Sequence, residues 1–206
     1  MCYEIADTSR FTKEEQHSFL MQGKNEVFKL ENLTKSLIQL SRLETNMIRL
    51  EPVYESLKKT LQGAVSSVYM KAYRKNIAIS VSEFEDENVL QDPRWTQEAL
   101  VNILDNAVKY SAPNTAVEIR VEPMVSYYLI EIEDQGIGIP KEERNQIFKR
   151  FYRGRSSAVQ ETDGSGVGLY LTRKILEEQG GSICVKSGRK GCIFQITYPK
   201  TSHRLS

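Results

Sequence analysis

The sequence predicts an α+β fold: a two-layer α/β sandwich whose mixed sheet is covered by helices, preceded by one long helix. A leucine-rich stripe recurs every three or four residues before Pro52, as on one face of a helix. After Pro52, strand-like and helix-like segments follow one another without the regular alternation of a doubly wound sheet. The chain has 206 residues, 27% charged and 40% hydrophobic, a composition typical of a globular protein.

Residues 11–50 are predicted to form the long helix. Thr12 and Glu15 have the spacing of a capping box at its start. The apolar stripe on one face comprises Leu30, Leu33, Leu37, Leu40, Leu43, Met47 and Leu50. A helical hairpin that dimerises into a bundle would bury this stripe, and so would packing against the rest of the chain. The sequence leaves both possibilities open.

Pro52 is expected to end this helix, because its ring clashes inside a continuing helix and suits the first turn of a new one. Further helices are expected over 53–73, 93–110 (with Asp92 as N-cap), 141–148 and 167–179. Strands are expected over 76–82, 117–121, 128–133, 181–186 and 192–198. The last two strands form a hairpin in this scheme.

Composition excludes several classes of function. Lys and Arg total 28 against 27 Asp and Glu, so a net charge of +1 gives no general affinity for nucleic acid or membranes. No apolar run approaches the roughly 20 residues that span a bilayer, and the start lacks the basic segment of a signal peptide. Cys2, Cys184 and Cys192 lack metal-site spacing and are expected to be reduced intracellular thiols.

Two polar clusters have the chemistry of a ligand site. On the helix 93–110, Asn102 and Asn106 lie one turn apart, with Lys109 three residues further on. Amide oxygens bind hard cations and an ammonium binds phosphate, although a solvated polar face has the same pattern. The segment 134–140, Asp-Gln-Gly-Ile-Gly-Ile-Pro, follows a strand. Its carboxylate can accept from an adenine amine, and a glycine-closed turn is the alternative.

Two further clusters fit anion binding. Residues 148–155 hold four cations, Lys149, Arg150, Arg153 and Arg155, with no acid among them. They fit an anion or an ordinary basic loop. Residues 164–169, Gly-Ser-Gly-Val-Gly-Leu, open a helix, where unpaired N–H groups bind anions. This segment is neither a Walker A loop nor a dinucleotide fingerprint.

In their order, the four clusters resemble the N, G1, F and G2 boxes of the catalytic ATP-binding domain of sensor histidine kinases, in the gyrase/histidine-kinase ATPase superfamily. The likeness covers about residues 52–200 and implies a Bergerat-type ATP-binding fold. Residues 40–44 resemble the end of the second helix of that family's dimerisation and histidine-phosphotransfer domain. The resemblance therefore implies a partial dimerisation domain over 1–51, a catalytic domain over 52–200 and a tail over 201–206.

The resemblance also implies a role for each matching residue. Asn106 is expected to ligate Mg²⁺, with Asn102 near the phosphates of ATP. Lys109 and Arg153 are expected to neutralise those phosphates. The nucleoside side of the implied site comprises Tyr110, Asp134 for the adenine amine, and Gly136, Gly138 and Ile139. Residues 149–165 are expected to form a mobile lid, and the implied contacts at its end are Gly164, Gly166, Val167, Gly168 and Leu169.

The sequence departs from the family at the phosphate acceptor, because no H box is present. His17 is followed by Ser-Phe-Leu-Met and is expected to be an ordinary helix residue. His203, in the polar tail, is not expected to be the acceptor either. No residue of this chain is therefore expected to act as a catalytic acceptor. The chain is read as a piece of a longer protein that begins just after the acceptor and does not autophosphorylate.

The resemblance implies a two-component kinase that transfers the γ-phosphoryl of Mg-ATP to a histidine for relay to a response-regulator aspartate. The full-length protein is expected to be a cytoplasmic homodimer with a membrane tether, without nucleic-acid binding. The hydrolytic members of this superfamily resemble one another in carrying a water-activating carboxylate at the position where this chain has Asn102. An amide cannot take a proton from water, so the resemblance favours a kinase over an ATPase. The alternatives are such an ATPase, a non-enzymatic docking module and a Ser/Thr kinase of the anti-sigma type.

Overall fold

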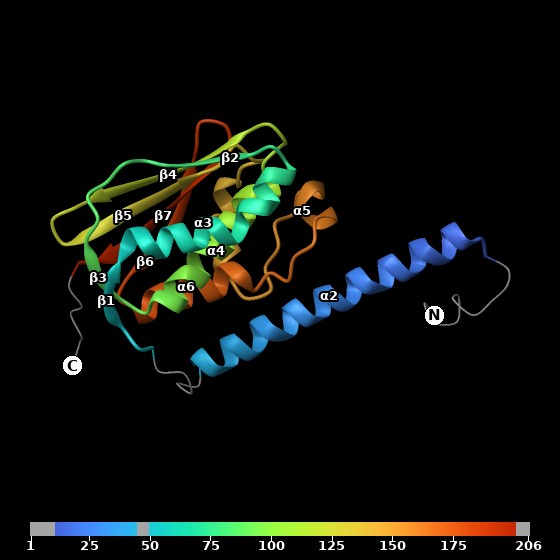
Figure 1. Ribbon diagram of the computed structural model, residues 1–206, viewed down its shortest axis with the longest axis horizontal. Coiled ribbons are helices and arrows are strands. Elements are labelled where there is room, and N and C mark those ends of the chain that lie inside the picture. Colours follow the sequence, from blue (N-terminus) through green and yellow to red (C-terminus); the bar gives the residue numbers. More distant parts are fainter. Residues whose placement is uncertain (1–10, 45–49, 201–206) are drawn as a thin grey trace.

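The computed structural model describes residues 11–44 and 50–200. Its main sheet has five strands in the order β2-β4-β5-β7-β6, with bounds Ala78–Val81, Ala116–Pro123, Tyr127–Glu133, Cys192–Pro199 and Ser182–Ser187. The β2–β4 pair is parallel and the other pairs are antiparallel. Helices α3 (Leu57–Arg74), α4 (Pro93–Tyr110) and α6 (Gly168–Glu178) cover one face of this sheet (Figure 1). The predicted α+β class and mixed sheet are confirmed.

The core lies between the sheet and these helices. Strands β4 and β7 alternate buried and less buried residues, so one face of each strand meets the helices. Helix α4 buries the side that carries Leu100, Ile103 and Leu104, each at most 1% exposed. On the other face of the sheet, Arg120 forms ion pairs with Glu131 and Glu133. One face of α4 is therefore buried against the sheet, and its polar side remains available to form a site.

The long helix is α2 (Lys13–Glu44), which precedes the sandwich as predicted and extends beyond it (Figure 1). The capping box forms, since the Thr12 N–H donates to Glu15 Oε2 at 2.8 Å and the Glu15 N–H donates to Thr12 Oγ1 at 3.3 Å. The predicted end at residue 50 is wrong, because Leu50 is not helical, and Met47 lies outside the described residues. No helix of the described ranges has the length and apolar character of a membrane span.

Packing against the rest of the chain accounts for part of the leucine stripe. Leu33 and Leu37 are partly buried against the core of the sandwich, and α2 contacts α6. Other apolar residues of α2 stay exposed: Leu20, Met21, Val27, Leu30 and Ile38. Among the α2 side chains that the structure describes, the sandwich thus covers only part of the apolar surface; the side chains of Leu40 and Leu43 lie outside the described ones.

Two strands differ from the sequence prediction. The segment predicted as one helix over 53–73 begins with β1 (Val53–Ser56), and α3 starts only at Leu57. Ser56 ends the strand and caps the helix, because its hydroxyl accepts from the Lys59 N–H at 2.9 Å. Strand β1 pairs antiparallel with β3 (Asn88–Gln91), which was not predicted. This pairing joins segments about 35 residues apart, and neither has an extended apolar pattern of its own.

The segments that connect the main helices and strands also differ from the sequence prediction, in smaller ways. The helix predicted over 141–148 is two short 3₁₀ turns, η1 (Lys141–Glu143) and η2 (Gln146–Phe148). The polar segment before the last helix contains a five-residue helix, α5 (Ser157–Glu161), that was not predicted. The helix predicted over 93–110 has the predicted bounds, and the other predicted helices and strands are present with one or both ends shifted. The predicted site segments therefore keep their places at the ends of these elements.

Candidate functional site

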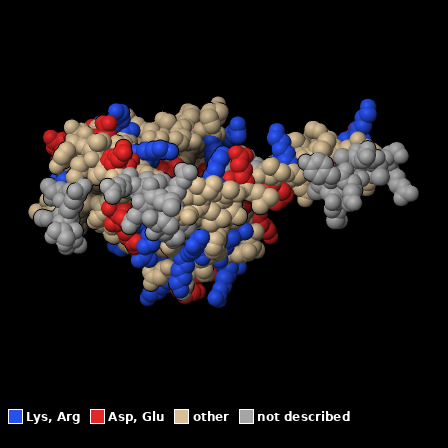
Figure 2. Space-filling view, turned by 90° about the horizontal axis from the view of Figure 1, so that it is seen from below, with Lys and Arg blue, Asp and Glu red and all other residues tan. Residues whose placement is uncertain are grey.

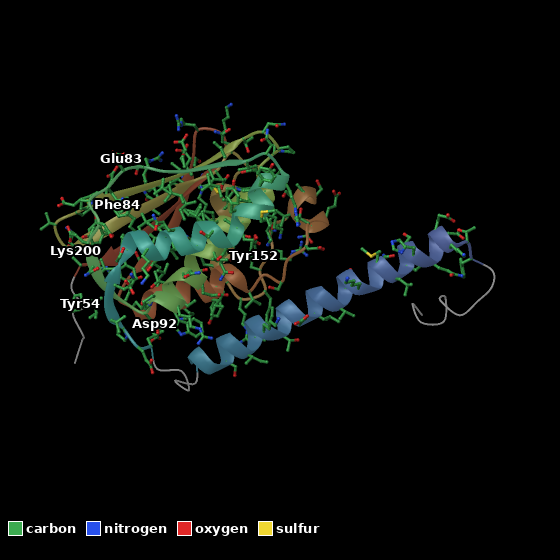
Figure 3. All side chains as sticks on the ribbon, in the orientation of Figure 1. Tyr54, Glu83, Phe84, Asp92, Tyr152 and Lys200 are labelled. Atoms are coloured by element: carbon green, nitrogen blue, oxygen red, sulfur yellow. The ribbon has the colours of Figure 1, made fainter. Side chains whose placement is uncertain are left out.

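Helix α4 positions the first polar cluster. Asp92 caps this helix, because its Oδ1 accepts from the Arg94 N–H at 3.1 Å and the Trp95 N–H at 3.2 Å, and Pro93 occupies the first turn (Figure 3). Since one side of α4 is buried against the sheet, Asn102 and Asn106 are half-buried at the edge of that contact. The two amides thus lie one helical turn apart on the side that borders α6.

Asn102 lies against the glycine that starts α6. A Cβ atom on Gly168 would be 3.5 Å from Asn102 Oδ1, so the fourth cluster meets the first. Asn102 Nδ2 is buried and has no hydrogen-bond partner among the described residues. A buried donor without an acceptor costs roughly 1–3 kcal/mol. This amide therefore has a free N–H group that suits an anionic ligand at the α6 N-terminus.

Lys109 connects the end of α4 with the polar segment that follows η2. Its Nζ donates to the main-chain carbonyl of Asp163, and a Cβ on Gly164 would be 3.0 Å from it. The same ammonium lies 4.8 Å from the centroid of the Tyr110 ring. The structure thus brings residue 164 next to residues 109 and 110, which lie more than fifty positions earlier in the sequence.

The second cluster, residues 134–140, lies against the end of α4 at Tyr110. Ser111, directly after α4, forms a β-bridge with Gly136. A Cβ on Gly136 would be 2.8 Å from the Tyr110 carbonyl oxygen and 3.0 Å from Asp134 Oδ1. Because these contacts leave no room for a side chain, Gly136 allows the loop to lie against α4. Asp134 therefore ends β5 next to the last turn of α4.

The carboxylate of Asp134 is held by three donors and is 4% exposed. Its Oδ1 accepts from the Gly136 N–H at 2.8 Å and the Cys192 N–H at 3.3 Å, and its Oδ2 accepts from Cys192 Sγ at 2.9 Å. Burial and the charge of Asp134 raise the pKa of the Cys192 thiol, so the thiol stays protonated and can donate. Hydrogen bonds to both of its oxygens therefore fix the orientation of the Asp134 carboxylate.

Gly191 and Cys192 are site residues that the sequence analysis did not identify. A Cβ on Gly191 would be 2.3 Å from Asp134 Oδ1 and 2.6 Å from the Gly136 nitrogen, so only glycine fits beside the carboxylate. Gly191 directly precedes β7 and Cys192 begins it, 57 and 58 positions after Asp134. A glycine just before a strand was visible in the sequence, but the partner strand that it faces was not.

The segment predicted as a lid folds back on itself through Arg153. Its guanidinium donates to the carbonyls of Val159, Gln160 and Thr162 at the end of α5. The Phe151 N–H donates to the Gly166 carbonyl at 2.9 Å. Gly166 has φ +69°, and a Cβ there would be 2.7 Å from the Phe151 carbonyl carbon, so it requires glycine. The hydrogen bonds of Arg153 that the structure describes thus lie within this segment.

The remaining predicted residues have structural contacts. Val167 is fully buried in the core, and Leu169 and Ile139 are half-buried against it. Gly138 has φ +71°, and a Cβ there would be 3.6 Å from the Gly191 carbonyl oxygen. Among the described residues, no group of three or more His, Cys, Asp or Glu side chains could enclose a metal ion. Amide oxygens, such as that of Asn106, also serve as oxygen ligands for a hard cation.

The chain matches the family model of the histidine kinase-, DNA gyrase B- and HSP90-like ATPases over residues 91–202. The sensor protein kinase PmrB of Pseudomonas aeruginosa is 31% identical over 88% of this chain and 38% of its own length. The signal transduction histidine-protein kinase ArlS of Staphylococcus aureus is 28% identical over 90% of this chain and 40% of its own. The chain therefore spans about two fifths of the length of these relatives.

Solved histidine kinase structures share the fold. The catalytic domain of histidine kinase ThkA is 27% identical and covers 73% of this chain and 97% of its own, with a TM-score of 0.65. Histidine kinase ThkA in complex with the response regulator protein TrrA covers 95% of this chain and 53% of its own, with a TM-score of 0.71 at 23% identity. The second likeness extends to the long helix as well as the sandwich.

Proposed function

This chain belongs to the family of histidine kinase-, DNA gyrase B- and HSP90-like ATPases and carries a catalytic domain of the sensor histidine kinase type, and we propose that it is the kinase core of a two-component sensor. It binds Mg-ATP and transfers the γ-phosphoryl to a histidine outside residues 1–206. A response-regulator aspartate then receives the phosphoryl group. The ThkA structure, which contains a response regulator, supports this partner.

The observation that carries this proposal is the meeting of three distant segments on α4. Gly168 lies against Asn102, the end of the lid contacts Lys109, and Gly136 lies against Tyr110 beside Asp134. One end of this arrangement offers a carboxylate, and the other offers an amide N–H, an ammonium and a glycine-rich helix start. A ligand with an amine at one end and phosphates at the other matches this distribution.

The carboxylate of Asp134 would accept a hydrogen bond from the adenine amine. The donors of Gly136 and Cys192 hold its two oxygens but do not use all their lone pairs, because a carboxylate has about four acceptor positions. Gly138 and Ile139 would shape the pocket beside the base, and Tyr110 would pack near the nucleoside. Selection of adenine over bases without an amine follows from this single contact.

The phosphate end would be held by Asn102, Asn106, Lys109 and Arg153, together with the glycines of residues 164–168 and the adjoining Val167 and Leu169. The buried N–H of Asn102 without a partner fits a phosphate oxygen, and the amide oxygen of Asn106 is a suitable Mg²⁺ ligand. Bound Mg²⁺ supplies positive charge across the phosphates. Lys109 and Arg153 now donate to carbonyls of the lid, so they would exchange these acceptors for phosphate oxygens when ATP binds.

Asn102 favours a kinase over an ATPase. An amide cannot remove a proton from water, so water at this position would not be activated for attack on the γ-phosphate. Bound ATP would then persist until an imidazole from the acceptor segment reaches it. Transfer would depend on positioning and on neutralisation of charge.

The proposal also extends to the organisation of the parent protein. Residues 1–51 would be part of a dimerisation and histidine-phosphotransfer domain, residues 52–200 the catalytic domain and residues 201–206 a tail. The parent would be a homodimer with its kinase core in the cytoplasm and a tether in the cell membrane. Since the chain has no H box, residues 1–206 alone would not autophosphorylate.

Radiolabelled γ-phosphate ATP tests the proposal. We expect acid-labile label on a longer protein that carries the H box, and none on residues 1–206 alone. The Asp134→Asn variant of the longer protein serves as the control and should lose labelling. Acid-labile label on residues 1–206 alone would contradict the missing acceptor. Repeated phosphate release without an acceptor would favour a hydrolase, and absence of Mg-ATP binding in calorimetry would favour a docking module.

A further inference from the structure

A basic hollow of about 330 Å³ lies between η2 and α6. One wall comprises Phe148, Lys149 and Arg150, and the other belongs to α6. None of the residues predicted to contact nucleotide lines this space, which we name the α6 hollow. Two of the four cations in residues 148–155, for which the sequence left an anion site and an ordinary basic loop open, therefore line this hollow, and Arg153 does not.

The helical repeat of α6 explains which of its side chains form the second wall of the α6 hollow. Tyr170, Arg173, Lys174 and Glu177 follow at intervals of three, one and three residues, which places them on one side of the helix. The opposite side is buried in the core through Leu171, Thr172, Ile175 and Leu176. Because the core fixes the rotation of α6, its charged side must face the turn that carries Lys149 and Arg150.

The charge of the α6 hollow is strongly positive. It has four cations and one carboxylate, Glu177, which Arg173 and Lys174 share at 2.6 and 3.1 Å. The pKa of Lys174 is raised by its hydrogen bond to Glu177, so both partners are charged at neutral pH. The chain as a whole carries only +1, so this is a local concentration of positive charge. Figure 2 shows basic side chains gathered along the lower edge of the sandwich.

The form of the hollow favours a polypeptide ligand. Its cations stand on two separate walls, and Lys149, Arg150 and Arg173 are exposed, whereas a small anion is usually enclosed by convergent donors. Buried Phe148 and half-buried Tyr170 add apolar surface for the aliphatic part of a side chain.

We propose that the α6 hollow is a docking surface for an acidic segment of a protein partner. Successive Asp and Glu side chains of such a segment would pair with Lys149 and Arg150 on one wall and with Arg173 and Lys174 on the other. The surface steers an acidic partner toward the chain and fixes its orientation. This inference does not rest on the proposed function: Lys149 and Arg150 lie at the start of the predicted lid, but none of the residues proposed to contact ATP lines the hollow.

Fluorescence anisotropy with a labelled hexaglutamate peptide tests the proposal, with hexaglutamine as the uncharged control. We expect saturable binding of hexaglutamate that weakens as salt is raised. The double variant Arg173→Gln/Lys174→Gln should weaken binding by about tenfold, since each exposed pair contributes up to about 1 kcal/mol. Its circular-dichroism spectrum and melting temperature report whether the fold is intact.

A matched variant separates a local site from general attraction. Lys58→Gln/Lys186→Gln removes the same charge from exposed positions outside the hollow and should bind hexaglutamate like the unmodified chain. Equal loss in both double variants would overturn the proposal. So would stronger competition by inorganic phosphate than by acidic peptide, or preferential binding to phosphatidylserine vesicles. A change of oligomeric state confined to Arg173→Gln/Lys174→Gln would assign the surface to a second copy of this chain instead.

Discussion

Asp134 is the residue on which nucleotide selection depends in the proposed function. Its carboxylate is almost fully buried, and every donor that holds it comes either from its own loop or from the start of β7. Cys192 contributes both its backbone N–H and its thiol. We infer that Cys192 acts on the nucleotide through Asp134, as a positioning residue.

Substitution of Cys192 tests this role. Cys192→Ala removes the thiol donor and should weaken ATP binding by about fivefold, since a weak hydrogen bond to a carboxylate contributes about 1 kcal/mol. Cys192→Ser restores a donor and should remain within about twofold of the unmodified chain. The readout is calorimetry with ATP and with purine riboside triphosphate, which lacks the 6-amine. Equal weakening of both nucleotides by Cys192→Ala would indicate a merely structural role.

The raised pKa of Cys192 predicts its chemical behaviour. Only the thiolate is alkylated readily, and burial beside Asp134 disfavours the thiolate. At about pH 8 we expect iodoacetamide to modify exposed Cys184 in the folded chain and to spare Cys192. In denaturant both should react, and mass spectrometry of the two tryptic peptides distinguishes them. Alkylation of both thiols at the same rate in the folded chain would refute the buried, protonated thiol.

The close packing around Gly191 provides a second test of how Asp134 is held. Gly191→Ala would place a Cβ 2.3 Å from Asp134 Oδ1, so the carboxylate or the β7 backbone must shift. We expect a loss of about 1–3 kcal/mol in the free energy of unfolding and a marked loss of ATP affinity. Gly188→Ala is the control, because its Cβ would have contacts of 3.4 Å. The account is wrong here if denaturant unfolding and calorimetry give the same values for both variants.

At the scale of elements, the lid owes its conformation to Arg153. Helix α5 has only five residues and no buried side chain, so it is marginal by itself. The guanidinium of Arg153 donates to the carbonyls of Val159 and Thr162 at the end of this helix, and the Val159 carbonyl also accepts from the Thr162 N–H at 3.3 Å. The lid in this conformation therefore depends on a cation that the proposed mechanism also needs at the phosphates.

Hydrogen exchange measures this dependence. In Arg153→Ala we expect amides of residues 157–163 to exchange about tenfold faster without nucleotide, because the carbonyl contacts are lost. Arg155→Ala removes an exposed neighbouring cation and should leave exchange unchanged. ATP affinity should fall only in Arg153→Ala. Unchanged exchange in Arg153→Ala would mean that other contacts determine the lid.

The elements also show where sequence analysis succeeds and where it stops. Helix α4 and the glycine clusters were predictable, because caps, periodicity and residue chemistry are local properties. Strands β1 and β3 were not, since each has four residues and is stabilised by pairing with the other. The role of Cys192 depends on the neighbouring strands β5 and β7, which no local pattern reveals. The separation of Lys149 and Arg150 from Arg153 likewise follows from tertiary packing.

At the scale of the whole molecule, α2 belongs to the proposed dimerisation domain and also contacts the proposed catalytic domain. Its Leu33 and Leu37 pack against the sandwich, and its exposed apolar residues remain for a second helix or a second copy. The sandwich places its predicted nucleotide residues around α4, which lies between α3 and α6 (Figure 1). The central claim is that the segments around α4 form one nucleotide site.

Nuclear magnetic resonance tests this claim most directly. Backbone amide shifts of the 23.6 kDa chain are followed during titration with Mg-ATP. We predict that signals from residues 102–110, 134–139 and 164–169 move together and fit one dissociation constant at one equivalent of nucleotide. Asp134→Asn should abolish the movement in all three segments. Movement of one segment alone, or different dissociation constants for the three, would contradict the account.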